Sequence, residues 1–522
     1  MNLCVELLDR RIEDGWGARV ALREPSRGWT FQHLADETGR AGNVLREHGV
    51  RKGDRVITLL TDRLEQAAFI LATIRLGALA VPLSELWRPN DLRALIADSG
   101  ARLVVVEQSL SAALEEVRGD LGEVQTVIAL DGAGPGQLDY AALHAAADPV
   151  CGFEECDIDD PAFLLYSAGG GDTAPKGVAH AHGTPVRAYA AYGTGVLGLT
   201  EHDKVFSAVK LASAYGLGAG LFFPLCAGAQ SFLLPERARP KTMFEVLEVW
   251  RPTVFFATPS LYGQMVHDFE QADGAVAKGV CSSVRRCVSG GEALPARLME
   301  RFRGMFGVEL LDGLGMTEAF HFVISNRPGA AKAGSSGLVL PGFEARVVGD
   351  DGRVLGPTEI GALEVRGPTV ARRYWGRGDD GSTFRGDGWV HTHDRVLVDK
   401  DGNYFHCGRT DDLFKVSGKW VSPIEVEQTL LAHPAVWECA VVPAEDEDGL
   451  VKPLAYVVPN VGHAPGAELA LELMEFVKRE IAPYKYPRWI DFVEGLPKNA
   501  AGKLLRFKLR QVGRRQPTRP PT

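Results

Sequence analysis

FLLYSAGGGDTAPKGVAHAHG (residues 163–183) is the most informative stretch of this sequence. An apolar run typical of a buried strand leads into consecutive glycines, then into Pro175-Lys176-Gly177, and then into a segment that we expect to be a helix. Glycines let backbone N–H groups approach a phosphate, and Lys176 adds positive charge. Because Pro175 stands where a Walker A loop has glycine, we predict a phosphate loop of another kind, with a plain glycine-rich turn as the alternative.

The segments on either side alternate β-rich and helical patterns. RVITLL (55–60) is followed by the helical pattern DRLEQAAFILATIRLG (62–77) and then by ALAVPLS (78–84). RLVVVE (102–107) and TVFFATP (253–259) are likewise followed by helical patterns. Such alternation indicates βαβ units with parallel sheets, so we predict an α/β fold for the N-terminal region.

Near residue 340 the pattern changes to antiparallel hairpins. PGFEARVVGDDGRVLGPTEIGALEVRG (341–367) and RVLVDKDGNYFHCG (395–408) each read as two strands around an Asp-Gly turn. Mixed helices and strands follow after Arg409. We therefore expect a large N-terminal domain (1–407) with a β-rich subdomain, a small mobile α+β lid (411–510) and a disordered Pro- and Arg-rich tail (511–522).

Composition narrows the classes of function and location. The net charge is −10, whereas a general nucleic-acid binder would be basic, so we expect no nucleic-acid partner. None of the eight cysteines forms a C-x-x-C pair, and the charged N-terminus lacks a signal sequence, which favours a cytoplasmic protein. The uncharged stretch 211–235 is long enough to cross a bilayer, but its glycines and Pro224 favour a buried helix and strand, so we expect no membrane contact.

Six motifs in order identify the family that the chain resembles. YSAGGGDTAPKG is similar to the phosphate loop of the adenylate-forming superfamily, which includes acyl- and aryl-CoA ligases. The other motifs are VSGGEALP (288–295), LDGLGMTEA (311–319), WVHTHDRV (389–396), GRTDDLFKVSGKWVSPIEVE (408–427) and PKNAAGKLLR (497–506). AVKLASAYGLGAGLFFPLCAGA (208–229) resembles benzoate-CoA-ligase-like enzymes in particular.

The resemblance implies the cofactors ATP or acyl-AMP, coenzyme A and Mg²⁺, with a small carboxylic acid or its adenylate as substrate. It implies that Thr317 contacts the α-phosphate, Glu318 holds Mg²⁺, and Lys503 bridges carboxylate and phosphate during adenylation. It also implies that Asp394 takes both ribose hydroxyls. The nucleotide-binding residues implied are Lys176, Gly290, Gly291, Glu292, Asp312, Thr317, Asp394 and Arg409.

The same resemblance places a hinge at Asp411, about which the small domain swings between the two half-reactions. Tyr215 is implied to be an aromatic gate between acid and thiol, with a core aromatic residue as the alternative. The residues implied to face CoA are Lys415, Ser417, Gly418, Lys419 and Trp420. The residues implied to line the acid pocket are Ala212, Ser213, Ala214, Tyr215, Gly216, Gly290, Gly313 and Gly315.

The phosphate loop departs from the family pattern. Gly170 and Gly171 stand where the family carries Ser or Thr, and Asp172 adds a negative charge. A carboxylate about 5 Å from a phosphate charge costs about 3 kcal/mol at an effective dielectric constant near 20. Each lost charge-assisted hydrogen bond adds about 1.5–3 kcal/mol. His393 also replaces the glycine of the Thr-Gly-Asp ribose motif, where its side chain either crowds the nucleotide or points outward.

Three functions remain open on these motifs. The first is an acyl-CoA ligase with weak or absent adenylation, which would receive an acyl-adenylate from a partner adenylating enzyme. The second is a complete ATP-dependent acid–CoA ligase, and the third is a non-catalytic acyl-nucleotide-binding protein. An adenylation domain that loads a carrier protein in place of CoA is a variant of the first two. The segment 415–420 favours the enzymes, since a pure binder has no use for it.

Two further features carry expectations. In benzoate-type relatives the stretch before Ala-Tyr-Gly tends to carry aromatic residues, but Ala212 and Ser213 occupy it here, so we predict a wide pocket and a bulky acid. The alternative is that Phe320 or Phe322 refills the space. The pairs His180/His182 and His391/His393 lack a third ligand of suitable spacing, so we do not expect a metal site there.

Overall fold

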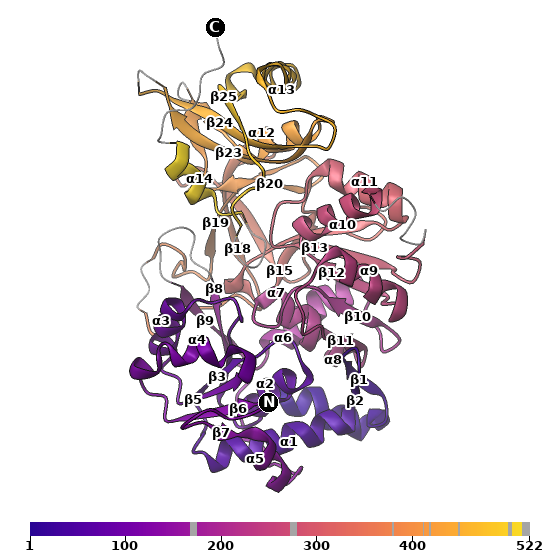
Figure 1. The fold of residues 1–522 in the computed structure, drawn as a ribbon, viewed down its shortest axis with the longest axis vertical. Coiled ribbons are helices and arrows are strands. Elements are labelled where there is room, and N and C mark those ends of the chain that lie inside the picture. The colour runs from indigo at the N-terminus through magenta and orange to yellow at the C-terminus, as the bar shows by residue number, and fades with distance from the viewer. Residues whose placement is uncertain are drawn as a thin grey trace.

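The computed structural model describes residues 1–167, 175–271, 279–377, 381–410, 412–416, 419–446, 449–498 and 504–513. Over these residues the chain forms two large sheets with flanking helices, a four-stranded antiparallel sheet and a small C-terminal α+β domain. Figure 1 places the N-terminal helices at one end of the molecule and the C-terminal domain at the other. The predicted α/β fold class is therefore confirmed.

The first sheet has seven strands within the described residues. In sheet order they are β7 (Leu138–Asp139), β6 (Thr126–Leu130), β5 (Leu103–Glu107), β3 (Arg55–Leu59), β4 (Leu79–Pro82), β8 (Pro161–Ser167) and β9 (Lys176–Ala181). All neighbours pair in parallel except β8 and β9. The helices here are α1 (Phe31–Glu47), α2 (Leu64–Arg75), α3 (Pro89–Ser99), α4 (Ser111–Glu115) and α5 (Tyr140–Ala146). Because α2 is apolar on all sides, it is buried.

The second sheet has nine strands in the described part of the chain. In order they are β16 (Leu338–Val339), β15 (Phe322–Ser325), β14 (Leu310–Gly315), β13 (Arg286–Gly290), β12 (Val254–Ala257), β10 (Lys204–Ser207), β11 (Gln230–Phe232), β1 (Val20–Arg23) and β2 (Gly28–Thr30). The strands from β14 to β1 are parallel, as the βαβ pattern predicted. The helices here are α6 (Thr184–Ala188), α7 (Ala214–Leu217), α8 (Phe223–Ala227), α9 (Pro240–Val249), α10 (Pro259–Gln271) and α11 (Ala296–Phe306).

Short π- and 3₁₀-helical turns complete the chain. They are η1 (Val5–Asp9), η2 (Ile12–Trp16), η3 (Gln108–Leu110), η4 (Arg118–Asp120), η5 (Tyr189–Leu197), η6 (Gly218–Phe222), η7 (Thr317–Ala319) and η8 (Pro483–Lys485). The uncharged stretch 211–235 forms α7, η6, α8 and β11 and is mostly buried, as predicted. In the part of the chain that the structure describes, every helix is too short or too polar to cross a bilayer.

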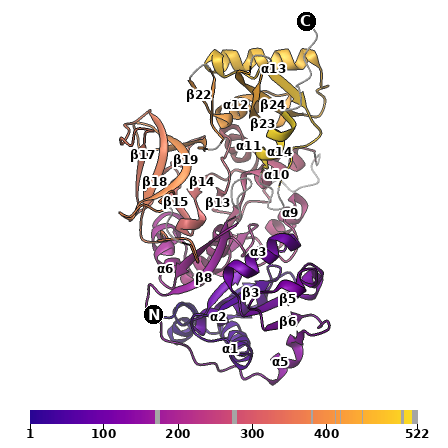
Figure 2. The same cartoon turned by 90° about the vertical axis from the view of Figure 1, so that its left-hand side faces the viewer.

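The predicted hairpins form the four-stranded sheet that stands beside the second sheet (Figure 2). Its strands are β17 (Glu344–Val348), β18 (Ile360–Arg366), β19 (Val390–Val398) and β20 (Tyr404–Arg409). The C-terminal domain contains β21 (Phe414–Val416), β22 (Lys419–Val421), α12 (Pro423–Leu431), β23 (Val436–Glu445), β24 (Val451–Pro459), α13 (Ala467–Glu480), β25 (Trp489–Phe492) and α14 (Arg506–Gly513).

Two expectations about local structure are wrong. The segment after Pro175 is the strand β9 rather than a helix, because Val178 and His180 are buried in register with β8 and the helix α6 starts only at Thr184. Residues 511–513, predicted as part of the disordered tail, belong to α14, which continues to Gly513. That helix is anchored where the hydroxyl of Tyr456 donates to the carbonyl of Leu509 at 3.4 Å. Residues 514–522 lie outside the described residues.

Candidate functional site

The carboxyl ends of three neighbouring parallel strands carry two of the predicted nucleotide motifs. β12, β13 and β14 pair in parallel, and their register sets Ser289 opposite Asp312 and Gly290 opposite Gly313. In an open α/β sheet the carboxyl ends of the strands form the edge at which ligands bind. The segments 288–295 and 311–319 therefore lie side by side at that edge.

Two glycines of the predicted acid pocket pack against one aromatic ring. A Cβ added to Gly290 would lie 2.4 Å from Phe322, and one added to Gly313 would lie 2.5 Å from the same ring. Phe322, in β15, is only 4% exposed and fills the space that both glycines leave. The expectation of a wide pocket is therefore wrong on this side. Gly315 packs against backbone instead, since its Cβ would lie 2.6 Å from the carbonyl oxygen of His321.

The predicted acid-pocket segment lies at the start of α7 and comprises Ala212, Ser213, Ala214, Tyr215 and Gly216. The hydroxyl of Tyr215 donates to the carbonyls of Val288 (3.1 Å) and Ala257 (3.3 Å), which fixes the ring against the ends of β13 and β12. Ser213 caps the helix, because its hydroxyl accepts the N–H of Gly216 at 3.1 Å. Tyr215 is partly exposed, and its ring lies 5.1 Å from the ring of Phe322.

His321 belongs to the same group of rings, although the sequence reasoning did not single it out. Its ring is 3% exposed and lies 4.6 Å from the Phe223 ring and 5.5 Å from the Tyr215 ring. Both ring nitrogens are buried, and the backbone of Tyr215 is a hydrogen-bonding neighbour of the ring. Burial lowers the pKa of His321 to about 3, so the imidazole is neutral. A neutral imidazole can both donate and accept a hydrogen bond, which suits a polar substituent on a bound ring.

The structure gives the two acidic residues Asp312 and Glu292 different surroundings. The carboxylate of Asp312 is buried, and its Oδ2 accepts the hydroxyl of Ser336 at 3.0 Å. Burial raises the pKa of Asp312 to about 7, while hydrogen bonds from Ser336, Ser289 and the N–H of Gly313 act in the opposite direction. A carboxyl group in the motif 311–319 is an acceptor of the kind that the exocyclic amino group of adenine needs. Glu292, by contrast, accepts the N–H and hydroxyl of Ser260 at 3.2 and 2.6 Å, at the start of α10.

Tyr374 brings together the residues predicted for phosphate and metal, and the sequence reasoning missed it. Its hydroxyl donates to Glu318 Oε1 at 2.7 Å, and the ammonium of Lys176 lies 4.7 Å from its ring centroid. The adjacent carbonyl of Thr317 accepts from His180 Nε2 at 2.9 Å. His180 thus stabilises the backbone of this turn through a hydrogen bond. It lies in the strand β9 rather than at a helix start.

Glu318 suits a Mg²⁺ ion that is held mainly by phosphate. In the described part of the chain no group of three or more His, Cys, Asp or Glu side chains is arranged to hold a metal ion. Mg²⁺ in nucleotide enzymes is usually bound by one or two carboxylates together with phosphate oxygens and water. A single carboxylate fixed by the Tyr374 hydroxyl matches that arrangement.

The ribose motif lies where β19 meets β20. Asp394 pairs with Arg409, whose Nη1 lies 3.7 Å away, and with His406 Nε2 at 3.2 Å. His393 has φ of +61°, which explains why glycine suits this position. Its Nε2 lies 3.1 Å from the hydroxyl oxygen of Thr383, so the ring is engaged with this neighbour. The two predicted nucleotide residues, Asp394 and Arg409, are therefore adjacent.

The predicted CoA-facing hairpin is only partly described. Lys415 and Arg395 both lie over the ring of Trp420, with the Lys415 ammonium at 4.6 Å and the Arg395 guanidinium at 5.0 Å from its centroid. Lys419 lies 5.1 Å from the ring of Tyr484, within the C-terminal domain. The predicted residues Asp411, Ser417, Gly418 and Lys503 and the loop 168–174 lie outside the described residues.

Comparison with known families agrees with these motifs. The family model described as AMP-binding enzyme matches residues 9–375, and the one described as AMP-binding enzyme C-terminal domain matches residues 425–503. This chain belongs to the AMP-binding enzyme family. The benzoate–CoA ligase of Thauera aromatica is 39% identical, with 98% of this chain and 96% of that protein covered. The 4-hydroxybenzoate–CoA/benzoate–CoA ligase of Rhodopseudomonas palustris is also 39% identical, with coverages of 98% and 94%.

Solved structures of AMP-binding enzymes share the whole fold. The anthranilate CoA ligase AuaEII in complex with anthranoyl-AMP has a TM-score of 0.92 and 36% identity, with 98% of this chain and 97% of that chain covered. A benzoate CoA ligase from Burkholderia xenovorans LB400 has a TM-score of 0.89 and 36% identity, with coverages of 98% and 100%. The family predicted from the six motifs is confirmed, and the enzyme class is that of the acid–CoA ligases.

Proposed function

We propose that this protein joins an aryl acid, received as its adenylate, to CoA, and that its own ATP-dependent adenylation is slow or absent. The observation that carries the proposal is the phosphate loop in the sequence. Gly170 and Gly171 replace hydroxyls that would bind the β- and γ-phosphates, and Asp172 adds a negative charge, whereas Asp312, Thr317 and Asp394 on the AMP side match the family motifs. A partner enzyme that forms the adenylate would then supply the substrate.

In this proposal the nucleotide lies across the ends of β13 and β14 and the middle of β19, where Asp394 pairs with Arg409. Asp312 accepts the adenine amino group, Asp394 accepts the ribose hydroxyls beside Arg409, and Thr317 contacts the α-phosphate. Glu318 holds Mg²⁺, which when bound neutralises phosphate charge. Lys176 and Glu318 both contact Tyr374, the lysine at its ring and the glutamate at its hydroxyl, which supports a role for Lys176 in the same phosphate environment.

The thioester step needs only the adenylate and CoA. The thiolate sulfur of CoA attacks the carbonyl carbon of the adenylate, a C–S bond forms, and the C–O bond to phosphate breaks. AMP leaves with that electron pair, and the thiol proton goes to solvent. Because an acyl-adenylate has one phosphate, this step makes no use of the altered loop. We propose that the lid (411–510) turns about Asp411 and presents the segment 415–420 to CoA, whereas Lys503 serves adenylation alone.

The walls of the site favour an aromatic acid. Tyr215 and Phe322 lie with ring centroids 5.1 Å apart, and an acid packed beside them would gain contacts that a flexible aliphatic chain would not. The neutral imidazole of His321, which packs beside the rings of Tyr215 and Phe322, adds a further aromatic group to this side of the site. With Phe322 closing one side, we propose that the acid is larger than benzoate in the direction of Ala212, where the side chain is small.

Restoring the loop tests the proposal. The variant Gly170→Ser/Gly171→Thr/Asp172→Gly should raise ATP–pyrophosphate exchange with the cognate aryl acid at least tenfold, while the rate of aryl-AMP plus CoA stays within about twofold. Asp148→Asn, which removes a charge from an exposed site, is the matched control. Rapid exchange by the unmodified protein would favour the complete ATP-dependent ligase. Replacing CoA by a carrier protein distinguishes the acceptors.

A further inference from the structure

Asp62 connects the first sheet to the acid-pocket segment of the second. It follows β3 in the loop before α2, and its side chain is 5% exposed. Both carboxylate oxygens accept the N–H of Leu211, Oδ1 at 3.0 Å and Oδ2 at 3.2 Å. Leu211 immediately precedes Ala212, so this contact fixes the backbone where the predicted acid pocket begins.

The segment from Leu211 to Tyr215 is held at both ends. At one end Asp62 holds the N–H of Leu211, and at the other the hydroxyl of Tyr215 donates to two strand carbonyls. The residue before the segment, Lys210, adds a third anchor, because its ammonium donates to the carbonyls of Leu234, Pro235 (3.2 Å) and Glu236 (2.8 Å). The position of Ala212 is therefore set by contacts outside its own segment.

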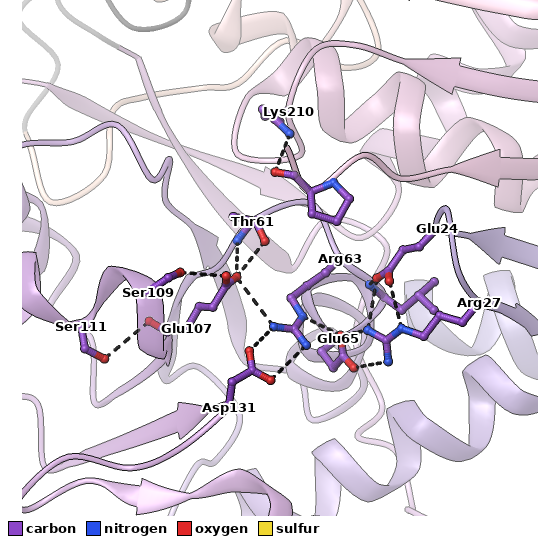
Figure 3. A network of polar contacts seen from close by, with 12 residues as sticks. Glu24, Arg27, Thr61, Arg63, Glu65, Glu107, Ser109, Ser111, Asp131 and Lys210 are labelled. Atoms are coloured by element: carbon purple, nitrogen blue, oxygen red, sulfur yellow. Dashed lines mark hydrogen bonds and ion pairs between the residues drawn. The ribbon is translucent and has the colours of Figure 1, made fainter. Parts of the chain in front are cut away.

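The loop that carries Asp62 is itself braced on both sides (Figure 3). Before Asp62, the N–H and hydroxyl of Thr61 donate to Glu107 Oε2 at 3.1 and 2.7 Å. After it, the N–H of Leu64 donates to Glu24 Oε1 at 2.6 Å. Glu107 ends β5 and Glu24 follows β1, so the loop is tied to both large sheets.

Two arginines complete this brace. Arg63 donates to Glu65 Oε2 at 2.8 Å and also pairs with Asp131, which follows β6. Arg27 makes two hydrogen bonds of 2.7 Å to the carboxylate of Glu65. Paired carboxylates and guanidinium groups with this bidentate geometry restrict side-chain motion more than single contacts do. These contacts hold the loop of Asp62 in place, and with it the carboxylate that accepts the N–H of Leu211.

We propose that Asp62 is a positioning residue that fixes the acid-pocket segment 211–216 and thereby sets the size of the aryl group that the enzyme accepts. The inference rests on the proposed function only in placing the aryl group against Ala212 and Tyr215. Without Asp62, the buried N–H of Leu211 would lack its acceptor, and the segment would shift to find another. Such a shift moves the wall that faces the aryl group and leaves the AMP site at the ends of β13 and β14 in place.

Calorimetric titration with non-hydrolysable adenylate mimics tests this role. The ligands are benzoyl- and 2-naphthoyl-sulfamoyladenosine, with AMP as the ligand that lacks the acid, and the proteins are the full chain and its variants. Asp62→Ala should weaken both aroyl mimics by about tenfold to a hundredfold, as expected when a buried N–H loses its partner. It should also narrow the difference in affinity between the two mimics. AMP affinity should stay within about twofold.

The conservative variant separates positioning from general stability. Asp62→Asn keeps one oxygen for the N–H of Leu211, so its affinity for both mimics should remain within about threefold of the unmodified protein. Asp120→Ala, which removes a carboxylate that is 69% exposed, is the control and should change nothing. If Asp62→Ala does not fold, Asp62→Ser takes its place. Its polar side chain is shorter by one atom, which draws the acceptor oxygen away from the N–H of Leu211. The affinities of this variant for AMP and for the two mimics are then compared in the same way.

Two results would overturn the inference. One is an Asp62→Ala protein that binds both aroyl mimics as tightly as the unmodified chain. The other is an equal loss of affinity for AMP and for the mimics, which would indicate a general structural role. An unmodified protein that binds the mimics but makes no thioester from aryl-AMP would refute the proposed function and leave this inference standing. An unmodified protein that binds neither mimic would refute both.

Discussion

Replacing Asp312 by asparagine should change how the stability of the protein depends on pH. Burial raises the pKa of this carboxyl from its ordinary value of 3.8 to about 7. Between these two values the unfolded chain is ionised while the folded protein keeps the proton. Stability therefore falls as pH rises through this window, by up to about 1.4 kcal/mol per pH unit, and levels off just above pH 7. From pH 5 to pH 7 the loss amounts to about 2 kcal/mol, because the folded carboxyl is already half ionised at pH 7.

Asparagine does not titrate, so the Asp312→Asn protein lacks this loss. The assay is urea unfolding of both proteins at pH 5, 6, 7 and 8, followed by tryptophan fluorescence. The variant should gain about 2 kcal/mol on the unmodified protein between pH 5 and 7 and less than about 0.5 kcal/mol more at pH 8. A change in packing shifts the free energy of unfolding of the variant by the same amount at every pH. The control Asp120→Asn, at an exposed site, should differ from the unmodified protein in free energy of unfolding by an amount that does not depend on pH. If the difference in free energy of unfolding between Asp312→Asn and the unmodified protein does not change with pH, the pKa of Asp312 is not raised by folding.

Three other changes follow from the site. Gly313→Ala places a Cβ 2.5 Å from Phe322, so it should destabilise the protein by about 1–3 kcal/mol and raise the KM for aryl-AMP, as thermal unfolding and kinetics would reveal. Tyr374→Phe removes the hydrogen bond to Glu318 and should weaken Mn²⁺ binding in the presence of AMP about tenfold or more, measured by electron paramagnetic resonance; unchanged affinity would remove Glu318 from the metal site. Asp411→Pro fixes φ at the proposed hinge and should lower thioester formation far more than acyl-AMP binding; equal CoA turnover would contradict the swing.

The sequence predicts the fold well because its patterns are local. The alternation of strands and helices over 55–107 and the Asp-Gly hairpins after 340 each reflect short-range periodicity, and the structure places them as predicted. The motif after β13 and the motif ending in Glu318 meet because the carboxyl ends of parallel strands share one edge. The segment that follows Lys176 was predicted as a helix, but its apolar alternation belongs to a strand that pairs with β8.

The remaining site residues depend on contacts between distant segments. Tyr374 reaches Glu318 across 56 positions of sequence, and neither residue's neighbourhood signals the pairing. Phe322 fills the space beside Gly290 and Gly313, so the small residues that suggested a wide pocket were matched by a large ring on another strand. Pocket volume is set by the sum of several walls, and a sequence motif describes only one of them.

We propose that the chain has kept the thioester half-reaction and lost most of its adenylation. The most direct test measures both with the unmodified protein and the same aryl acid. Synthetic aryl-AMP plus CoA should give thioester rapidly, while acid plus ATP and Mg²⁺ should show pyrophosphate exchange at least a hundredfold slower. Exchange as fast as thioester formation, with ordinary affinity for ATP, would contradict the claim.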